Sequence, residues 1–317
     1  MSESWPGNSP RHPHRWCSAR EELSSFWVMP NSKVARMMVN HHDQETIVLV
    51  KRTRDKEAAA RSAKCVADVH FALVDFLAAG QTLSEIDEFI GRTLEGMGCK
   101  SAFLRYRIPG HPPFPSHSCL SPNDCVVHGT HLMTDKPIAP GDLLSIDIGV
   151  THKGWIGDAA WTYGIEGVED EAMRLMRAGR ESLKAGVDAM QPGRPLLDWA
   201  RAVENCINEA SFSLVQGLGG HGYGRRLHGP PFISNVVPKR QGEWPDAFRT
   251  FEPGLLVAVE PMVNARTPDI TNTPSDWPIF TSDGALSVHY EADVLITEHG
   301  RDVLTESMFD LPDIVGN

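Results

Sequence analysis

Two parts of this chain of 317 residues repeat each other at one fixed offset, which restricts the folds that the chain can adopt. Gly80 and Gly193 each lie between two helix-like segments. The interval between these glycines also separates the run Pro140-Gly-Asp-Leu-Leu-Ser-Ile-Asp147 from the run Pro253-Gly-Leu-Leu-Val-Ala-Val-Glu260. One offset for a helical part and a strand part predicts two copies of a helix–helix–strand unit. We therefore expect one α+β domain built from two pseudo-symmetric halves, with a site between them.

The spacing of apolar residues predicts the helices of each unit. Over residues 54 to 79 apolar side chains recur every three or four residues, as in an amphipathic helix that Gly80 would close. Thr82-Leu-Ser-Glu85 has the pattern of a capping box, so a second helix is expected after it. Residues 169 to 190 repeat the helical spacing, and Pro195 suits the first turn of a further helix. Residues 46 to 50 favour a short strand.

The first 45 residues differ from the rest, because they are rich in Pro, His, Ser and Arg and show no sustained periodicity. We expect a flexible N-terminal extension over residues 1–45, a catalytic domain over 46–305 and a C-terminal tail over 306–317. Translation that begins at Met37 or Met38 is an alternative account of the extension.

Composition excludes several classes of function. The formal net charge is −11, so nucleic acid is a poor partner. None of the six cysteines forms a C-x-x-C pair, which argues against a thiolate zinc site and favours free thiols in a reducing compartment. The first 30 residues contain no apolar stretch as long as that of a signal peptide, and no apolar run in the chain approaches the roughly 18 residues of a membrane span. These features predict a cytoplasmic protein without a membrane partner.

Carboxylates occur inside apolar, strand-like runs, where a charge is costly. Residues 142 to 163 read as a hairpin that turns near His152-Lys153, which would place Asp147 directly opposite Asp158. Two facing carboxylates in a buried strand pair require a cation or a shared proton. The alternative is an exposed face on which water solvates both groups.

Further acids and two histidines extend this candidate set. Glu260 ends one apolar run and Glu291 lies within another, where Asp293 shares its face by alternation; both glutamates could instead face water at strand ends. Glycines crowd around His221, which implies close approach of the backbone there, and His228 follows in the same segment. Four carboxylates with at least one imidazole suit Mn²⁺, Fe²⁺ or Co²⁺ at least as well as Zn²⁺. Such a set fits a site with two ions about 3.5–4 Å apart, and therefore metal-assisted hydrolysis.

The order and context of these residues resemble a known family. Asp147, Asp158, His221, Glu260 and Glu291 occur in the order of the metal ligands of the "pita-bread" metallopeptidases. The resemblance to methionine aminopeptidases covers about residues 50 to 305 and is carried by five strings: Asp147-Ile-Gly-Val150, Gly157-Asp-Ala-Ala160, Gly220-His-Gly-Tyr-Gly224, Val259-Glu-Pro-Met-Val263 and Tyr290-Glu-Ala-Asp-Val-Leu-Ile-Thr297. It implies the pita-bread fold, in which the two halves surround a curved antiparallel sheet. It also implies removal of the N-terminal methionine of nascent proteins, with a preference for a small second residue.

The resemblance implies two divalent ions (Co²⁺, Mn²⁺, Fe²⁺ or Zn²⁺) and a role for each ligand. Asp147 would chelate one ion, and Asp158 and Glu291 would bridge both. His221 and Glu260 would hold the other ion, with Glu260 also a candidate for proton transfer.

The resemblance also implies residues that contact the substrate. His128 would lie near the substrate's amino end, and His228 would bind the scissile carbonyl or the oxyanion. Cys119, Phe114 and Trp277 would form walls of the methionine pocket, with ordinary core packing as the alternative for these three.

Spacing and local departures refine this expectation. Type II relatives carry a long insertion between the positions of His221 and Glu260, whereas the interval between these residues is short here, which favours type I. The chain departs from the family pattern at Gly229, where glutamate is usual, at Gly129-Thr130, and in an insertion-like run over residues 105–113.

Three functions are compatible with the sequence: a methionine aminopeptidase, a related peptidase of another specificity such as cleavage before proline, and a non-catalytic binding protein of the same fold. The complete set of five ligands favours the first. We expect a monomer whose substrate is the N-terminal methionine of polypeptides, and the family makes the ribosome a candidate partner.

Overall fold

The computed structural model describes residues 47–316. Over this range the α-helices are α2 (Thr53–Phe76), α3 (Leu83–Gly96), α4 (Asp170–Ala189) and α5 (Leu197–Ala210), and two short 3-10 helices are η1 (Pro245–Phe248) and η2 (Glu306–Asp310). The strands are β1 (Lys100–Ser101), β2 (Cys119–Pro122), β3 (Cys125–Val127), β4 (Leu143–His152), β5 (Trp155–Ile165), β6 (Ser213–Leu214), β7 (Gly219–Gly222), β8 (Gly229–Ser234), β9 (Leu256–Val259), β10 (Met262–Asn264), β11 (Ile270–Asn272), β12 (Ile279–Thr281), β13 (Ser287–His289), β14 (Ala292–Ile296), β15 (Arg301–Val303) and β16 (Ile314–Val315).

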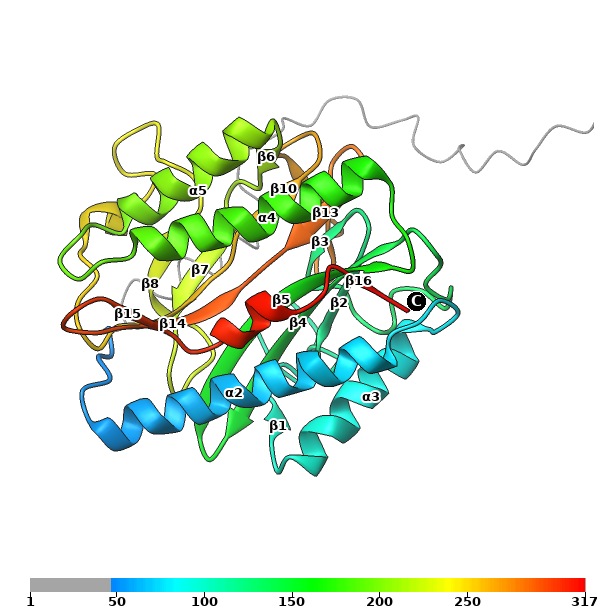
Figure 1. Cartoon of the computed structure of the whole chain (residues 1–317), viewed down its shortest axis with the longest axis horizontal. Coiled ribbons are helices and arrows are strands. Elements are labelled where there is room, and N and C mark those ends of the chain that lie inside the picture. The colour runs from blue at the N-terminus through cyan, green and yellow to red at the C-terminus, as the bar shows by residue number, and fades with distance from the viewer. Residues whose placement is uncertain (1–46, 317) are drawn as a thin grey trace, which may run out of the picture. The chain divides into compact units, whose positions relative to one another are not determined.

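Two five-stranded sheets carry most of these strands. One has the order β1-β4-β5-β16, with β2 paired to β4, and the other has the order β15-β14-β9-β7-β8. All pairs are antiparallel except β5 with β16. The sheets meet where the Glu291 N–H donates to the Ala160 carbonyl at 2.9 Å and the Asp158 N–H donates to the Asp293 carboxylate at 2.9 Å. β5 and β14 therefore lie side by side in the middle of the structure (Figure 1).

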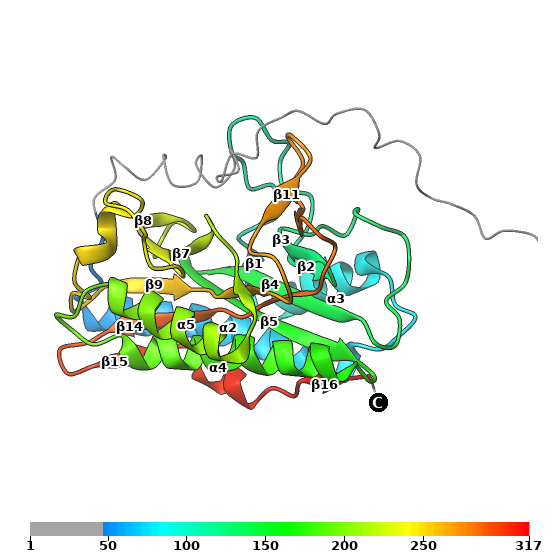
Figure 2. The same cartoon turned by 90° about the horizontal axis from the view of Figure 1, so that it is seen from above.

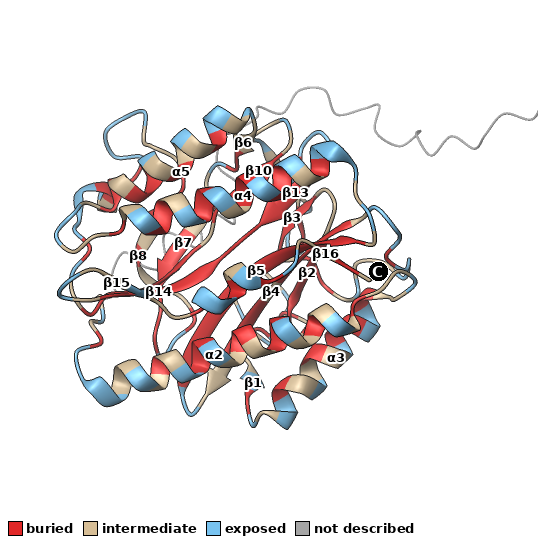
Figure 3. Cartoon of the chain, in the orientation of Figure 1, coloured by how far each residue is buried: buried red, intermediate tan, exposed pale blue. Residues whose placement is uncertain are grey.

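The helices cover one face of the strands, and the loops around β3 and β11 lie on the other face (Figure 2). The helices pack their apolar stripes onto the strands. Fully buried examples are Val66, Val69 and Leu73 of α2 and Leu175 and Leu183 of α4. The central strands are buried along nearly their whole length, whereas the outer faces of the helices are exposed (Figure 3). The described helices are amphipathic, and none of them is long and apolar enough to span a membrane.

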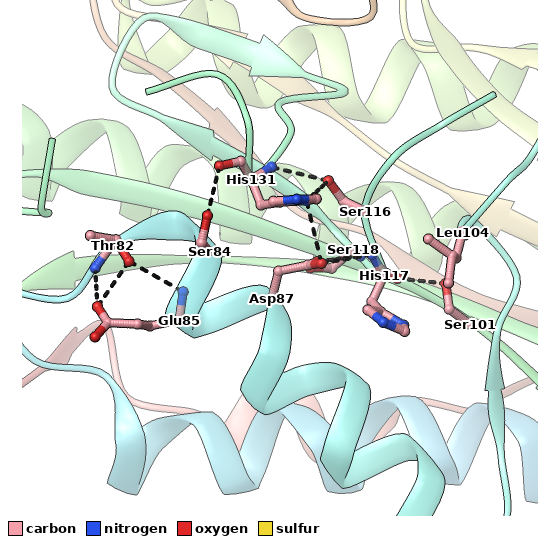
Figure 4. A network of polar contacts seen from close by, with 10 residues as sticks. All are labelled: Thr82, Ser84, Glu85, Asp87, Ser101, Leu104, Ser116, His117, Ser118 and His131. Atoms are coloured by element: carbon pink, nitrogen blue, oxygen red, sulfur yellow. Dashed lines mark hydrogen bonds and ion pairs between the residues drawn. The ribbon is translucent and has the colours of Figure 1, made fainter. Parts of the chain in front are cut away.

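The predicted capping box is confirmed at the start of α3. The Glu85 N–H donates to the Thr82 hydroxyl at 3.3 Å, and the Thr82 N–H donates to the Glu85 carboxylate at 2.8 Å (Figure 4).

Two helix boundaries differ from prediction. α2 ends at Phe76, because Leu77 is already extended, and Gly80 lies in the following turn with φ +93°. Pro195 precedes α5 and pairs with Thr250 instead of entering the first turn.

The predicted strand over residues 46–50 is wrong. Of its described residues only Leu49 makes a bridge, to Leu255, and Val50 donates its N–H to the Gly254 carbonyl. The apolar run thus packs against the domain without extending a sheet. The extension predicted over residues 1–45 lies outside the described residues.

The segment expected to follow the domain as a tail is part of its structure. Residues 306–316 include η2 and β16, and Met308, Leu311 and Val315 are buried. Asp313 accepts a hydrogen bond from Arg180 of α4 at 2.7 Å. The packed domain therefore extends past the boundary predicted at residue 305, because these apolar residues complete the core beside β5.

Candidate active site

The hairpin formed by β4 and β5 brings the first two acids together, but not in the predicted register. Asp147 pairs with Ala160, and Asp158 pairs with Gly149. The turn is Lys153-Gly154, with φ +49° and +79°, as two-residue hairpin loops require. Because the turn lies one residue later than expected, the acids are diagonal neighbours and not direct partners. They still project from the same face, since two residues separate their pairing positions.

The other candidate ligands reach this face from the second sheet. His221 lies in β7, Glu260 directly follows β9, and Glu291 directly precedes β14. Ligand atoms of Asp158, His221 and Glu291 all lie within 4.8 Å of one another. His221 Nε2 is 3.7 Å from Asp158 Oδ2. These three residues are only 3%, 7% and 3% exposed, so their polar groups converge in the buried interior.

Glycines on both sides of His221 allow β7 to lie between β8 and β9. A Cβ at Gly220 would be 2.3 Å from the Ala258 carbonyl oxygen, and a Cβ at Gly222 would be 2.1 Å from the Pro230 carbonyl oxygen. Either contact is far shorter than a van der Waals distance. The close backbone approach predicted from the glycine-rich segment is confirmed, and it fixes the position of the His221 ring.

Burial raises the pKa of every candidate carboxyl in the metal-free site. It raises the pKa of Asp147 to about 7 and that of Glu260 to about 8. The pKa values of Asp158 and Glu291 are raised well above the usual range, first by burial and then by the neighbouring carboxylates. The site as a whole therefore favours either bound protons or bound cations.

The donor set fits divalent metal ions. Asp147 Oδ1 and Asp158 Oδ1 are buried and accept no hydrogen bond from any residue in the described range 47–316. A buried carboxylate oxygen without a donor is costly, and a coordinated cation removes that cost. Four carboxylates and one imidazole are oxygen-rich ligands of the kind that Mn²⁺, Fe²⁺, Co²⁺ and Zn²⁺ accept.

One pocket brings together the five candidate metal ligands and the five candidate substrate contacts. Its lining comprises the five candidate ligands, the five candidate substrate contacts and three further residues: Asp147, Asp158, His221, Glu260, Glu291, Phe114, Cys119, His128, His228, Trp277, Phe103, Tyr106 and Leu227. The pocket lining thus combines carboxylate and imidazole side chains with apolar and aromatic ones.

The aromatic wall of the pocket consists of Phe114 and Trp277, which pack against each other. Trp277 packs edge-to-face against Phe114, with ring centroids 5.2 Å apart, and its indole N–H donates to the Pro112 carbonyl at 3.0 Å. Burial raises the pKa of the Cys119 thiol well above its usual value, so the thiol is neutral. These side chains are largely buried, as ordinary core packing predicts, yet they also line the pocket.

A polar network fixes the segment that leads into β2 and Cys119 (Figure 4). The buried Asp87 carboxylate accepts the backbone N–H groups of His117 and Ser118 at 2.9 and 3.0 Å. His131 Nδ1 lies 2.8 Å from the Ser116 hydroxyl. Because these bonds hold consecutive backbone groups, they set the position of the adjoining pocket wall.

His128 follows β3 in a left-handed conformation, with φ +60°. Its Nδ1 is buried and has no hydrogen-bond partner among residues 47–316. Burial lowers the pKa of His128 to about 4, with His289 and His111 contributing. The ring is therefore neutral at physiological pH, and it can donate a hydrogen bond to a bound ligand or accept one from it.

Two polar residues at the site were not predicted from the sequence. His289 is buried, and its Nε2 lies 3.3 Å from Glu260 Oε2. His289 lies two residues before Glu291 in a strand-like segment, so the alternation of strand side chains could have placed both on the same face. The Tyr106 hydroxyl lies 2.7 Å from His228 Nδ1, and no sequence signal pointed to that contact. Asp293, the alternative to Glu291, does not line the pocket and instead accepts the Asp158 N–H.

Comparison with known proteins agrees with this geometry. Residues 56–298 match the family described as metallopeptidase family M24. The chain belongs to this family. This M24 chain is 35% identical over 265 residues to methionine aminopeptidase 1 of Mycobacterium tuberculosis, with 82% of this chain and 95% of that protein covered. It is 30% identical over 259 residues to methionine aminopeptidase 1 of Bacillus subtilis, with 82% and 99% covered.

Solved structures show the same fold. Methionine aminopeptidase from Rickettsia prowazekii matches with a TM-score of 0.75 at 27% identity, covering 82% of this chain and 100% of that one. X-Pro aminopeptidase from Thermotoga maritima shares the fold alone, with a TM-score of 0.63 at 20% identity, covering 84% and 63%. This M24 chain is therefore an α+β hydrolase of the metallo-aminopeptidase class, as the sequence predicts.

Proposed function

We propose that this M24 chain removes the N-terminal methionine of polypeptides by hydrolysis assisted by two metal ions, with a preference for a small second residue. The observation that carries the proposal is the pocket whose lining combines the five ligand-type side chains with an apolar wall of Phe114, Cys119 and Trp277. A flexible, unbranched methionine side chain suits such a wall. Similar proteins are named methionine aminopeptidases, two of them methionine aminopeptidase 1, which supports the same substrate.

Asp147, Asp158, His221, Glu260 and Glu291 would hold two divalent ions, with Co²⁺, Mn²⁺, Fe²⁺ and Zn²⁺ as candidates. When bound, the ions would supply an activated water and polarise the scissile carbonyl. The paired buried oxygens of Asp147 and Asp158, which accept no hydrogen bond among the described residues, support their role as ligands.

The chain's own groups would perform the remaining tasks. The neutral His128 ring would hydrogen-bond the substrate near its amino end, since it lines the pocket beside Trp277 with ring centroids 6.3 Å apart. His228 would hold the scissile carbonyl oxygen as its charge develops. Glu260, 3.3 Å from His289, would carry the proton to the leaving amine. The aromatic wall would exclude water from the methionine side chain.

Peptide hydrolysis tests this proposal directly. The metal-stripped protein would be given Mn²⁺, Co²⁺, Fe²⁺ or Zn²⁺ and assayed on Met-Ala-Ser and Met-Pro-Ala. We expect metal-dependent release of methionine, and faster release from these peptides than from one with a bulky second residue. A folded protein that binds two ions yet releases no methionine would contradict the proposal. A panel of peptides with proline at the second position and varied first residues would then test cleavage before proline.

We further propose that the two halves are related by an internal repeat. Gly141 and Gly254, which the sequence offset relates to each other, have φ +92° and +96°, and β4 and β9 begin at Leu143 and Leu256 with the same offset.

The free cysteines support the cytoplasm as the location, where nascent polypeptides would be the substrate and the ribosome a candidate partner. A monomer stays the expected state, which light scattering would test.

A further inference from the structure

The insertion-like segment between Phe103 and Phe114 places one polar side chain against His228. The Tyr106 hydroxyl lies 2.7 Å from His228 Nδ1, and the two rings meet edge-to-face with centroids 5.2 Å apart. Both side chains line the pocket, although 122 positions separate them in the chain. This contact joins two segments that are distant in the sequence and that both line the pocket.

Backbone hydrogen bonds hold Tyr106 in this position. The Tyr106 N–H donates to the Phe103 carbonyl at 2.7 Å, and the Tyr106 carbonyl accepts the Phe114 N–H at 2.9 Å. The Arg105 N–H donates to the Phe114 carbonyl at 2.8 Å, which closes the base of the loop. The far part of the loop is fixed through the Pro112 carbonyl, which accepts the Trp277 indole N–H. The hydroxyl is therefore presented by a loop that is anchored at both ends.

The chemistry of the two groups favours the Tyr106 hydroxyl as the donor of this hydrogen bond. A phenol is a good donor, and a neutral imidazole offers one basic nitrogen as acceptor. When the Tyr106 O–H donates to Nδ1 of a His228 ring that carries one proton, that proton must reside on Nε2. That tautomer makes Nε2 a hydrogen-bond donor, which is the form needed to stabilise negative charge on a carbonyl oxygen. Gly229, the next residue in the chain, has no side chain that could hold the ring instead.

We propose that Tyr106 is a positioning residue that fixes the orientation and the Nε2–H tautomer of His228. This inference rests on the proposed function for its consequence in catalysis, but the tautomer itself can be tested without turnover. Tyr106 acts through His228 and contacts the reacting carbonyl only indirectly. The insertion-like run thus supplies a restraint that the neighbouring glycine cannot.

The first experiment measures the ring nitrogens by ¹⁵N NMR on the full chain labelled at histidine and loaded with Zn²⁺, which is diamagnetic. The His228 signals are assigned by their loss in His228→Ala. We expect the Nε2–H tautomer in the unsubstituted protein and a mixture of tautomers in Tyr106→Phe. A proton on Nδ1 in the unsubstituted protein, or an unchanged tautomer in Tyr106→Phe, would overturn the proposal.

The second experiment separates positioning from general destabilisation by kinetics on Met-Ala-Ser. Tyr106→Phe should lower kcat about tenfold to 100-fold with little change in KM, as loss of an orienting partner does. In a His228→Ala background the same substitution should have no further effect, because nothing is left to orient. Arg107→Ala, in the same loop, is the matched control and should keep kcat. Additive losses in the double variant would refute the positioning role.

The two experiments fail independently of the proposed function. If the unsubstituted protein releases no methionine, the proposed function fails while the NMR measurement still decides the tautomer. If methionine is released but the tautomer is unaffected by Tyr106→Phe, only the role of Tyr106 is refuted.

Discussion

Asp147 and Asp158 each keep a buried oxygen that accepts no hydrogen bond from any residue between 47 and 316. Such groups destabilise a fold unless a ligand compensates them. The packing of this region therefore sacrifices stability in the metal-free state to create affinity for cations. The same trade explains why these carboxyls have raised pKa values although His221 and His289 lie nearby.

Asp158→Asn tests that trade at a single residue. The substitution keeps the shape of the side chain and removes its charge, so at pH 8 we expect the metal-free protein to become more stable. Metal affinity should fall, and turnover should drop by about 10³-fold or more, since metal catalysis contributes several kcal/mol. Urea unfolding, calorimetric metal titration and peptide hydrolysis measure the three effects. His221→Ala should also lose turnover but without the gain in stability, and a stable, fully active Asp158→Asn would refute the ligand role.

Single residues of the site were more predictable than their contacts. Each candidate ligand stands in a local string that an acid or histidine would not otherwise favour, so Asp147 or Glu260 could be selected from the sequence alone. The contact of Tyr106 with His228 could not, because it depends on how two loops close in space. The register of the β4–β5 hairpin was also missed, since moving the turn by one residue shifts the pairing by two.

The short strand β7 depends on residues without side chains. Gly222→Ala would push a methyl group into the Pro230 carbonyl, so we expect a loss of about 1–3 kcal/mol in the free energy of unfolding, together with weaker metal binding through displacement of His221. Gly229→Ala is the matched control in the adjacent strand, where the new Cβ would meet its nearest atom at an ordinary 3.5 Å. Equal effects of the two substitutions in urea unfolding would contradict this account.

The C-terminal elements η2 and β16 contribute to the core, although the sequence predicted a tail. Periodicity over so few residues is weak, and the parallel pairing of β16 with β5 cannot be inferred locally. The helices, by contrast, were predictable because their apolar stripes extend over several turns, with errors confined to the ends of α2 and α5.

Shortening the chain after Thr305 should therefore destabilise the whole domain. Met308, Leu311 and Val315 would no longer be buried, at about 1.5–3 kcal/mol for each side chain. Leu311→Ala alone should cost about 2–5 kcal/mol. Thermal unfolding monitored by circular dichroism measures both, with Glu306→Ala, an exposed position in η2, as the control. A truncated chain with an unchanged melting temperature would show that the segment is dispensable.

The stability of the whole metal-free molecule should fall as the pH rises from about 6.5 to 8. The folded-state pKa values of Asp147 and Glu260, about 7 and about 8, lie above their ordinary values of 3.8 and 4.5. In this window the folded protein retains protons that the unfolded chain has lost, so raising the pH favours unfolding. Between about pH 4 and 6.5 the buried His128 and His289 have the opposite effect on stability, because their pKa values are lowered to about 4. In that range the unfolded chain binds protons that these two folded imidazoles do not, so raising the pH favours the folded protein.

Thermal unfolding of the chelator-treated, metal-free protein at several pH values measures this effect. Melting temperatures of the metal-free protein should decrease between pH 6.5 and 8, and the stabilisation by added Mn²⁺ or Zn²⁺ should increase over the same range because the ions displace protons. The metal-loaded protein is the control. A metal-free melting temperature that rises with pH throughout this window would mean that these carboxyls are not protonated in the folded state.

The seam where the Glu291 N–H meets the Ala160 carbonyl has a consequence for biosynthesis. Asp147 leaves the ribosome long before Glu291, so a growing chain lacks part of the proposed metal site until the second sheet has docked on the first. We therefore expect the ions to bind after the two sheets have docked, and not to direct that docking. Refolding with Zn²⁺ present from the start should therefore be no faster than refolding followed by its addition. Newly made copies of this protein would stay inert until their own synthesis is nearly complete.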